Sequence, residues 1–351
     1  MSVTGTPTET QTRPGLLDRL GSGPVICAEG YLFECERRGY LQAGAFVPEV
    51  VLEHPEVVRQ LHRDFVHAGS DVVQAFTYYA HREKLRLIGK PQLLEAINRQ
   101  ALTIAGEVAD ESGTLLAGGL SNTNVYADDD ESRRAVRSMF EEQVGWAAEV
   151  KVDFIIAETF DYFEEGMIAL DVIQEAGIPS VVTFVVHQAE QTRDGVTPED
   201  ACRRAEEAGA DVVGLNCGRG PSTMLPTLER IRGAVKGNLA ALPVPYRTTP
   251  EQPTFQSLRD PEHGDMPFPT ALDPFQCTRY EVADFARRAA ELGVNYVGLC
   301  CGAGPHHVRS LAEALGRRPP ASRYSADMSK HAFFGTDTSL KTTNQDYASQ
   351  L

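Results

Sequence analysis

The stretch "VVGLNCGRGPS", residues 212–222, is an apolar run that ends at a cysteine and continues into a turn containing glycine and proline. The stretch "YVGLCCGAGPH", residues 296–306, aligns with it without a gap 84 residues later. Each stretch predicts a strand, a glycine turn and the start of a helix. Two such units in one chain favour a fold that is built from repeated strand–helix pairs.

The same alternation continues outward from these two stretches, beginning at residue 24. Short apolar, β-rich runs alternate with longer stretches whose apolar residues recur every three or four positions, as in amphipathic helices. Several runs are almost continuously apolar, which is typical of parallel strands that are covered on both faces. The eight predicted strands are residues 24–29, 71–77, 115–121, 154–159, 180–186, 212–217, 239–246 and 295–300.

Eight strand–helix units predict an α/β protein with a (β/α)₈ TIM barrel over residues 21–317. An open doubly wound sheet is the alternative, but no G-x-G-x-x-G motif follows the first run. Residues 1–20 are polar and predict a disordered leader. Residues 318–351 leave the barrel pattern and predict an extended C-terminal arm, either docked on the barrel or used in oligomer contacts. The Pro- and Asp-rich stretch 246–276 predicts a functional loop after the seventh strand.

The composition narrows the classes of partner. The chain has 33 Lys and Arg against 49 Asp and Glu, a formal net charge of −16. This charge disfavours nucleic acids and anionic membranes but not a cationic small molecule. No apolar run approaches the roughly 20 residues that span a bilayer, and the N-terminus lacks the features of a signal peptide, so a cytoplasmic protein is expected. The seven cysteines are odd in number and irregularly spaced. They indicate free thiols or metal ligands in a reducing compartment.

Three cysteines are expected to meet at one place. Side chains at the C-terminal ends of barrel strands converge on one mouth, and Cys217, Cys300 and Cys301 end the predicted sixth and eighth strands. Three thiolates with an open fourth position suit a catalytic Zn²⁺. Simple packing of buried thiols and a strained disulfide between the neighbouring pair are the alternatives. Four further cysteines lack the strand-end glycine context and are expected only to pack: Cys27, Cys35, Cys202 and Cys277.

With "VGLNC" (213–217) and "VGLCCGAGPHHVRSLAEAL" (297–315), the chain resembles the homocysteine S-methyltransferase family. The segments "LEHPE" (52–56) and "FTYYA" (76–80) resemble the betaine-type branch of that family, and the similarity runs from about residue 24 to 322. The resemblance implies a barrel that binds zinc through the three strand-end cysteines. Homocysteine would occupy the fourth position through its sulfur and accept a methyl group from betaine or a related onium compound, giving methionine.

Other roles follow from the resemblance one residue at a time. Glu158, at the end of the predicted fourth strand, matches a glutamate that holds the amino group of homocysteine. Tyr79 matches a tyrosine near both zinc and the methyl donor. Phe46 stands where the betaine-type enzymes have a tryptophan that faces the cation of the methyl donor. The resemblance also implies substrate contacts for Glu29, Gly30, Thr159 and Asn216.

The chain departs from the family at its first predicted strand. In "CAEGY", residues 27–31, Ala28 and Glu29 stand where the family commonly has Asp-Gly, and Thr159 stands where the betaine-type enzymes have a tyrosine. The methyl donor therefore stays open between betaine, another methylated amine, and a sulfonium compound such as S-methylmethionine or a dimethylsulfonium acid. A non-catalytic relative that binds zinc or a thiol is a further alternative. His306 and His307 are expected to be exposed at a helix start.

Overall fold

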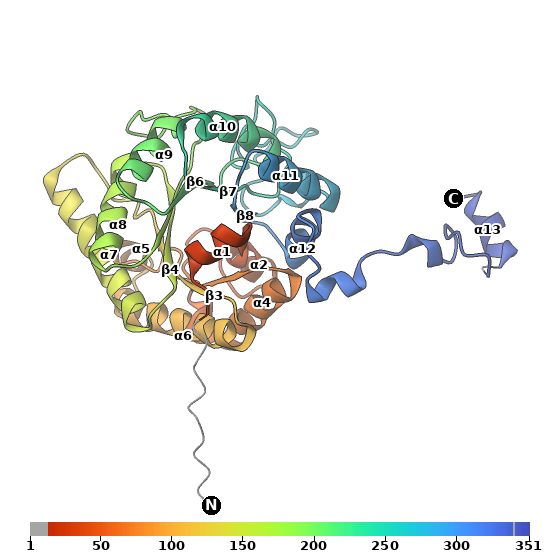
Figure 1. The fold of residues 1–351 in the computed structure, drawn as a ribbon, viewed down its shortest axis with the longest axis horizontal. Helices are drawn as coiled ribbons and strands as arrows, with labels where there is room; N and C mark the ends of the chain where they lie inside the picture. Colours follow the sequence, from red (N-terminus) through yellow and green to blue (C-terminus); the bar gives the residue numbers. More distant parts are fainter. Residues whose placement is uncertain (1–12, 340) are drawn as a thin grey trace, which may run out of the picture.

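The strands form a sheet that closes on itself. In the computed structural model, which describes residues 13–339 and 341–351, eight parallel strands pair in sequence order and the last pairs with the first (Figure 1). The predicted (β/α)₈ barrel is therefore confirmed. The strands are β1 (Val25–Ala28), β2 (Val72–Gln74), β3 (Leu115–Ser121), β4 (Phe154–Phe160), β5 (Ser180–Phe184), β6 (Val212–Asn216), β7 (Asn238–Leu242) and β8 (Tyr296–Leu299).

The strands lie where the apolar runs of the sequence predict them. Every residue of β4 is buried, because helices cover the outside of the barrel and side chains fill its interior. β2 is shorter than the predicted run at 71–77. After Ala75 the backbone turns, with the Thr77 N–H donating to the Ala75 carbonyl at 2.8 Å. The residues that follow therefore leave the strand ladder and begin the loop that carries Tyr79.

Helices form the outer ring of the barrel (Figure 1). One apolar cluster lies between the strands and these helices, and a second fills the barrel interior with strand residues such as Phe154, Ile156 and Tyr296. The barrel is therefore a packed core rather than a pore. The helices of the ring and its connections are α2 (Tyr31–Arg37), α3 (Val50–Glu53), α4 (Pro55–Ala68), α5 (Arg82–Leu87), α6 (Leu94–Ser112), α7 (Asp130–Glu149), α8 (Phe163–Glu175), α9 (Pro198–Glu207), α10 (Pro221–Ala234), α11 (Arg279–Glu291) and α12 (Pro305–Ala314).

The predicted disordered leader, residues 1–20, differs from the structure at its end. Residues 1–12 lie outside the described residues, but helix α1 (Leu16–Ser22) begins within the predicted leader. Leu16 and Leu20 are four positions apart and lie on one face of this helix. Both join the apolar cluster inside the barrel, and α1 crosses the centre of the barrel in Figure 1. The prediction of disorder is therefore wrong for residues 16–20, because the two leucines are buried against the barrel interior.

The C-terminal arm leaves the barrel and ends at helix α13 (Thr342–Ala348) (Figure 1). It begins with the short 3₁₀ helix η3 (Pro320–Tyr324), which packs on α4 and α12, and continues through η4 (Met328–Lys330). Several large apolar side chains on the arm are exposed, among them Phe334, Tyr347 and Leu351. Among the described helices, none has both the length and the apolar character needed to cross a membrane.

Candidate metal and substrate site

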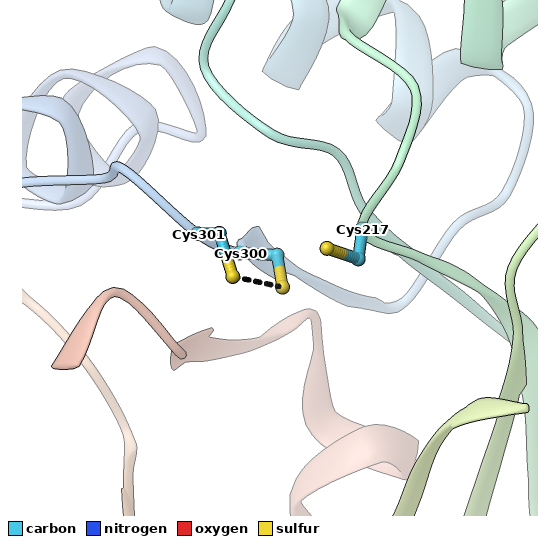
Figure 2. A group of neighbouring side chains, drawn as sticks. All are labelled: Cys217, Cys300 and Cys301. Carbon is cyan, nitrogen blue, oxygen red and sulfur yellow. Dashed lines mark hydrogen bonds between the residues drawn. The ribbon is translucent and has the colours of Figure 1, made fainter. Parts of the chain in front are cut away.

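Three sulfur atoms meet at the C-terminal mouth of the barrel. Cys217 directly follows β6, and Cys300 and Cys301 directly follow β8. The three Sγ atoms all lie within 4.8 Å of one another, and the Sγ atoms of Cys300 and Cys301 are 3.9 Å apart (Figure 2). We call these three residues the sulfur cluster. Two adjacent cysteines can both contribute because β8 ends at Leu299, so the strict alternation of strand faces no longer applies.

The backbone at both strand ends is shaped for this convergence. Cys217 itself has a positive φ of 56°, and Gly218 follows it with a φ of 62°. Gly302 comes directly after the cysteine pair with a φ of 92°. A β-carbon at position 302 would overlap the Tyr246 hydroxyl, so glycine is required here for space as well as for backbone conformation. The two turns that match in the sequence therefore both contain left-handed backbone. It lies at Cys217 and Gly218 after β6, and at Gly302 after β8.

The sulfur cluster fits a tetrahedral metal ion. Zinc–sulfur bonds of about 2.3 Å in a tetrahedron place neighbouring sulfurs about 3.8 Å apart, close to the observed 3.9 Å between Cys300 and Cys301. All seven cysteines are free, so the predicted alternative of a disulfide between the neighbouring pair does not occur in this structure. Hydrogen bonds from the other two thiols lower the pKa of Cys217 well below its usual value. A cluster that favours a thiolate is suited to a soft divalent cation.

A buried carboxylate lies beside the sulfur cluster. Glu158, near the end of β4, accepts hydrogen bonds from Gln74 Nε2 at 2.6 Å, from Asn216 Nδ2 at 3.0 Å and from the Thr159 hydroxyl at 3.4 Å. Burial raises its pKa to about 7, while these bonds act in the opposite direction. Asn216 also contacts the sulfur of Cys300, with its Nδ2 at 3.9 Å from Sγ. These bonds fix the Glu158 carboxylate at the edge of the sulfur cluster.

A second buried carboxylate, that of Glu29, lacks such hydrogen-bond partners within the described part of the chain. Glu29 directly follows β1 and is 7% exposed, yet neither of its carboxyl oxygens has a hydrogen-bond partner among the described residues. A ligand atom of Glu29, one of Glu158 and the sulfur of Cys300 lie within 4.8 Å of one another. Burial, and then the neighbouring Glu158, raise the pKa of Glu29 well above its usual value. An unpaired buried carboxylate is unfavourable, so this carboxylate pair, Glu29 and Glu158, is suited to receive a cation.

Gly30 lets the first strand approach the sulfur cluster. A β-carbon on Gly30 would overlap the carbonyl of Ala303, in the turn that follows the cysteine pair. The absence of a side chain at this position therefore allows the end of β1, with Glu29, to lie against the turn after β8.

A cavity opens beside the sulfur cluster, and we call it the aromatic chamber. Cys217 and Cys301 lie on its wall together with Thr159, so the cavity connects directly with the cluster. The predicted loop after the seventh strand contributes Phe255, Gln256 and Phe268, which places that loop over the site as expected. The aromatic lining residues are Phe33, Phe46, Tyr78, Tyr79, Phe255 and Phe268, and the polar ones are Asn122, Asn124, Thr159, Asp161, His187 and Gln256.

Backbone strain is concentrated around this chamber. Six non-glycine residues in the described part of the chain have clearly positive φ values, and five of them line the chamber: Phe46, Tyr79, Asn124, Thr159 and Cys217. Bulky and β-branched residues rarely adopt this conformation, which costs about 1–3 kcal/mol each and clusters at functional sites. Strain of this kind makes the chamber a candidate functional site.

The structure brings the predicted site residues together. Glu29, Gly30, Glu158 and Asn216 lie on the cluster side, whereas Phe46, Tyr79 and Thr159 line the chamber. Other chamber residues were not predicted. Phe33 lies in the first turn of α2, which follows β1, whereas the two asparagines follow β3 and Asp161 directly follows β4. Their positions at the C-terminal ends of strands were the only signal that could have pointed to them.

His307 differs from its prediction, since it is 1% exposed rather than a solvent-facing residue. Its Nδ1 accepts a hydrogen bond from the Gly304 N–H at 3.2 Å, and its Nε2 lies 3.2 Å from the Cys277 carbonyl. The His307 ring therefore caps the N-terminus of α12 and connects that helix to the segment that precedes α11. His306 is exposed at the start of α12, as predicted. The four cysteines predicted only to pack are all buried and free: Cys27, Cys35, Cys202 and Cys277.

Comparison with known proteins identifies relatives over almost the whole chain. A family model described as homocysteine S-methyltransferase matches residues 31–315. Betaine–homocysteine S-methyltransferase 1 of Xenopus tropicalis is 38% identical over 353 residues, covering 95% of this chain and 83% of that protein. S-methylmethionine–homocysteine S-methyltransferase of Rattus norvegicus is 37% identical over 341 residues, covering 93% of this chain and 88% of that protein.

A solved structure shares the fold. The metallated form of the homocysteine methyltransferase MmuM from Escherichia coli matches with a TM-score of 0.66 and 18% sequence identity. The match covers 84% of this chain and 97% of that one. At 18% identity, this similarity shows that the two proteins share the barrel fold.

Proposed function

The chain belongs to the homocysteine S-methyltransferase family, and we propose that it transfers a methyl group from betaine or a related onium compound to homocysteine, giving methionine. Its relatives make it an enzyme of this kind, so the non-catalytic alternative is not favoured. The single observation that carries the proposal is the sulfur cluster, open on one side to the aromatic chamber and bordered on another by the carboxylate pair.

We propose that Cys217, Cys300 and Cys301 hold zinc. The support is the all-sulfur composition of the cluster, the 3.9 Å between the sulfurs of Cys300 and Cys301, and the position of the cluster at a strand-end mouth. When bound, zinc would keep the sulfur of homocysteine as a thiolate, which is the nucleophilic form. The protein residues described next would orient the two substrates around that sulfur.

We propose that the carboxylate pair binds the ammonium group of homocysteine. Glu158 is oriented by Gln74 and Asn216, and Glu29 faces it with both oxygens unpartnered. An ammonium group between them would supply hydrogen-bond donors to Glu29 and neutralise the repulsion between two buried acids. Both acids lie near Cys300, so a substrate held there by its ammonium group would direct its thiol toward the sulfur cluster.

We propose that the aromatic chamber binds the methyl donor. Faces of Phe and Tyr rings attract quaternary ammonium and sulfonium groups, and Phe46 and Tyr79 line the chamber next to Cys217 and Cys301. The methyl group would pass from the positively charged nitrogen or sulfur to the thiolate of homocysteine. The carbon–onium bond breaks as the new carbon–sulfur bond forms, and the methyl donor leaves as a neutral amine or sulfide. No proton transfer is needed in this step.

The polar lining of the chamber favours a second candidate, a sulfonium amino acid such as S-methylmethionine. Asp161 is the acid of the chamber, and no Lys or Arg is among its described lining residues. Asn122 Oδ1 and Gln256 Oε1 are buried acceptors without a hydrogen-bond partner among the described residues. These acceptors suit the ammonium group that S-methylmethionine carries in addition to its sulfonium. The described lining offers the carboxylate of betaine no Lys or Arg, only the imidazole of His187.

Substitution of Asp161 separates the two kinds of methyl donor. We expect Asp161→Asn to raise the KM for S-methylmethionine about tenfold, because a charge-assisted hydrogen bond is lost. The KM for betaine and for a dimethylsulfonium acid should change less than about twofold, since neither carries an ammonium N–H. Steady-state methionine formation with each compound measures this. Arg193, whose guanidinium lies 3.5 Å from Asp161, provides the control.

In that control, Arg193→Gln removes the competing cation and should lower or preserve the KM for S-methylmethionine. The sulfonium candidate is rejected if betaine is the best substrate of the panel and Asp161→Asn affects all methyl donors equally.

We also propose that the arm at 318–351 contacts a second copy of the chain, which would make the protein a homo-oligomer. The exposed aromatic residues Phe334 and Tyr347 on an arm that leaves the barrel support this. Sedimentation of the full chain and of a chain ending at residue 317 measures it. A cytoplasmic location is proposed because all seven cysteines are free.

A further inference from the structure

A buried acid lies behind the aromatic chamber and takes no part in the proposed chemistry. Glu165, on α8, is 1% exposed. Its Oε1 accepts two hydrogen bonds from one residue, from the Thr123 N–H at 2.8 Å and from the Thr123 hydroxyl at 2.5 Å. Burial raises the pKa of Glu165 to about 7, and the two bonds from Thr123 act in the opposite direction. A single residue thus supplies the specific polar contacts of this acid.

Thr123 lies at the centre of a segment that builds the chamber wall. Its two neighbours, Asn122 and Asn124, both line the chamber, while Thr123 itself is 1% exposed and turned away toward α8. Asn124 has a positive φ of 62°, a conformation that is uncommon outside glycine. Such a conformation persists only where surrounding contacts fix it, and the bonds from Thr123 to Glu165 are contacts of that kind.

The same segment also supports Tyr79. The Tyr79 N–H donates to the hydroxyl of Ser121 at 3.3 Å, and Tyr79 and Asn124 line the same chamber. Residues 121–124 therefore connect α8 on one side with the Tyr79 wall of the chamber on the other. None of these contacts involves the sulfur cluster or the carboxylate pair.

We propose that Glu165 is a positioning residue for the methyl donor, acting through Thr123 to hold Asn122, Asn124 and Tyr79 on the wall of the aromatic chamber. The inference rests on the proposed function of the chamber. Loss of the contact should loosen the chamber wall and weaken binding of the methyl donor. It should leave zinc and homocysteine binding unchanged, because the carboxylate pair is held by separate bonds from Gln74 and Asn216.

The test uses the zinc-loaded full chain and compares Thr123→Val with Thr123→Ser. Valine has nearly the same shape as threonine but lacks the hydroxyl, whereas serine retains it. We expect Thr123→Val to raise the Kd for betaine and for S-methylmethionine, measured calorimetrically, by about tenfold, since a hydrogen bond to a charged group is lost. The Kd values of Thr123→Ser for both methyl donors should stay within about threefold of those of the unsubstituted protein.

Glu165→Leu removes both bonds and should weaken binding of the methyl donor by more than Thr123→Val does. Glu165→Gln keeps an acceptor oxygen and should restore most of the affinity. Glu164→Gln, at the neighbouring carboxylate whose side chain is 40% exposed, is the matched control and should have no effect. In every variant the Kd for homocysteine and the zinc content should remain unchanged.

Equal weakening of homocysteine and methyl-donor binding would overturn the inference, because it would indicate general loss of structure. Unchanged methyl-donor affinity in both Thr123→Val and Glu165→Leu would overturn it as well. Failure of the proposed function looks different. In that case the unchanged chain forms no methionine with any methyl donor, while the binding measurements still decide the role of Glu165.

Discussion

Cys301→Ser is expected to abolish zinc binding and methyl transfer while the barrel stays folded. Removing a group that merely orients a metal ligand lowers metal affinity or activity by about 10–100-fold, so removing a ligand should lower activity more than about 100-fold. Cys301 is the partly exposed member of the sulfur cluster, so its substitution disturbs little packing. Metal analysis of protein purified without oxygen, together with methionine formation, measures both effects.

Cys277→Ser is the matched control for this substitution. Cys277 is a free cysteine like Cys301, but it is buried and lies outside the sulfur cluster. It should retain one zinc per chain and full activity. A Cys301→Ser protein that keeps both its zinc and its activity would contradict the assignment of the cluster.

Glu158→Gln is expected to weaken homocysteine binding by about 30-fold or more, because truncating one partner of a buried charge pair costs about 2–5 kcal/mol. Glutamine occupies nearly the same volume and can keep one bond to Asn216, so the barrel should remain intact. The ammonium group of homocysteine would then have only Glu29 as a charged partner. Calorimetric titration of homocysteine into the zinc-loaded protein measures the loss.

The specificity of that effect separates substrate binding from a structural role. Zinc content should be unchanged in Glu158→Gln, and the KM for the methyl donor should move less than about threefold, since Glu158 is not among the described residues that line the chamber. Undiminished affinity for homocysteine would refute the role of Glu158. Glu29→Gln in the same assay shows whether the unpartnered acid shares the ammonium group.

The sequence predicted the parts of the fold that depend on regular patterns. The eight apolar runs became the eight strands because a strand buried on both faces needs apolar residues throughout. The meeting of Cys217 with Cys300 and Cys301 followed from strand order alone, since the C-terminal ends of barrel strands share one mouth.

Other features depend on contacts that no local pattern encodes. Helix α1 lies in a polar segment, and only its fit against the barrel interior explains the burial of Leu16 and Leu20. The sequence predicts that His307 is exposed, but its ring accepts a hydrogen bond from the Gly304 N–H and so caps the N-terminus of its own helix. The bond from Thr123 to Glu165 joins residues 42 positions apart. The left-handed backbone at Phe46 and Tyr79 is imposed by surrounding structure against local preference.

Zinc K-edge X-ray absorption of the zinc-loaded protein tests the central claim most directly, because it counts the sulfur atoms around the metal. The account predicts three sulfur ligands in the free protein, from Cys217, Cys300 and Cys301, and a fourth after homocysteine is added. A free protein with fewer than three sulfurs at zinc, or a count that stays the same with saturating homocysteine, would contradict it.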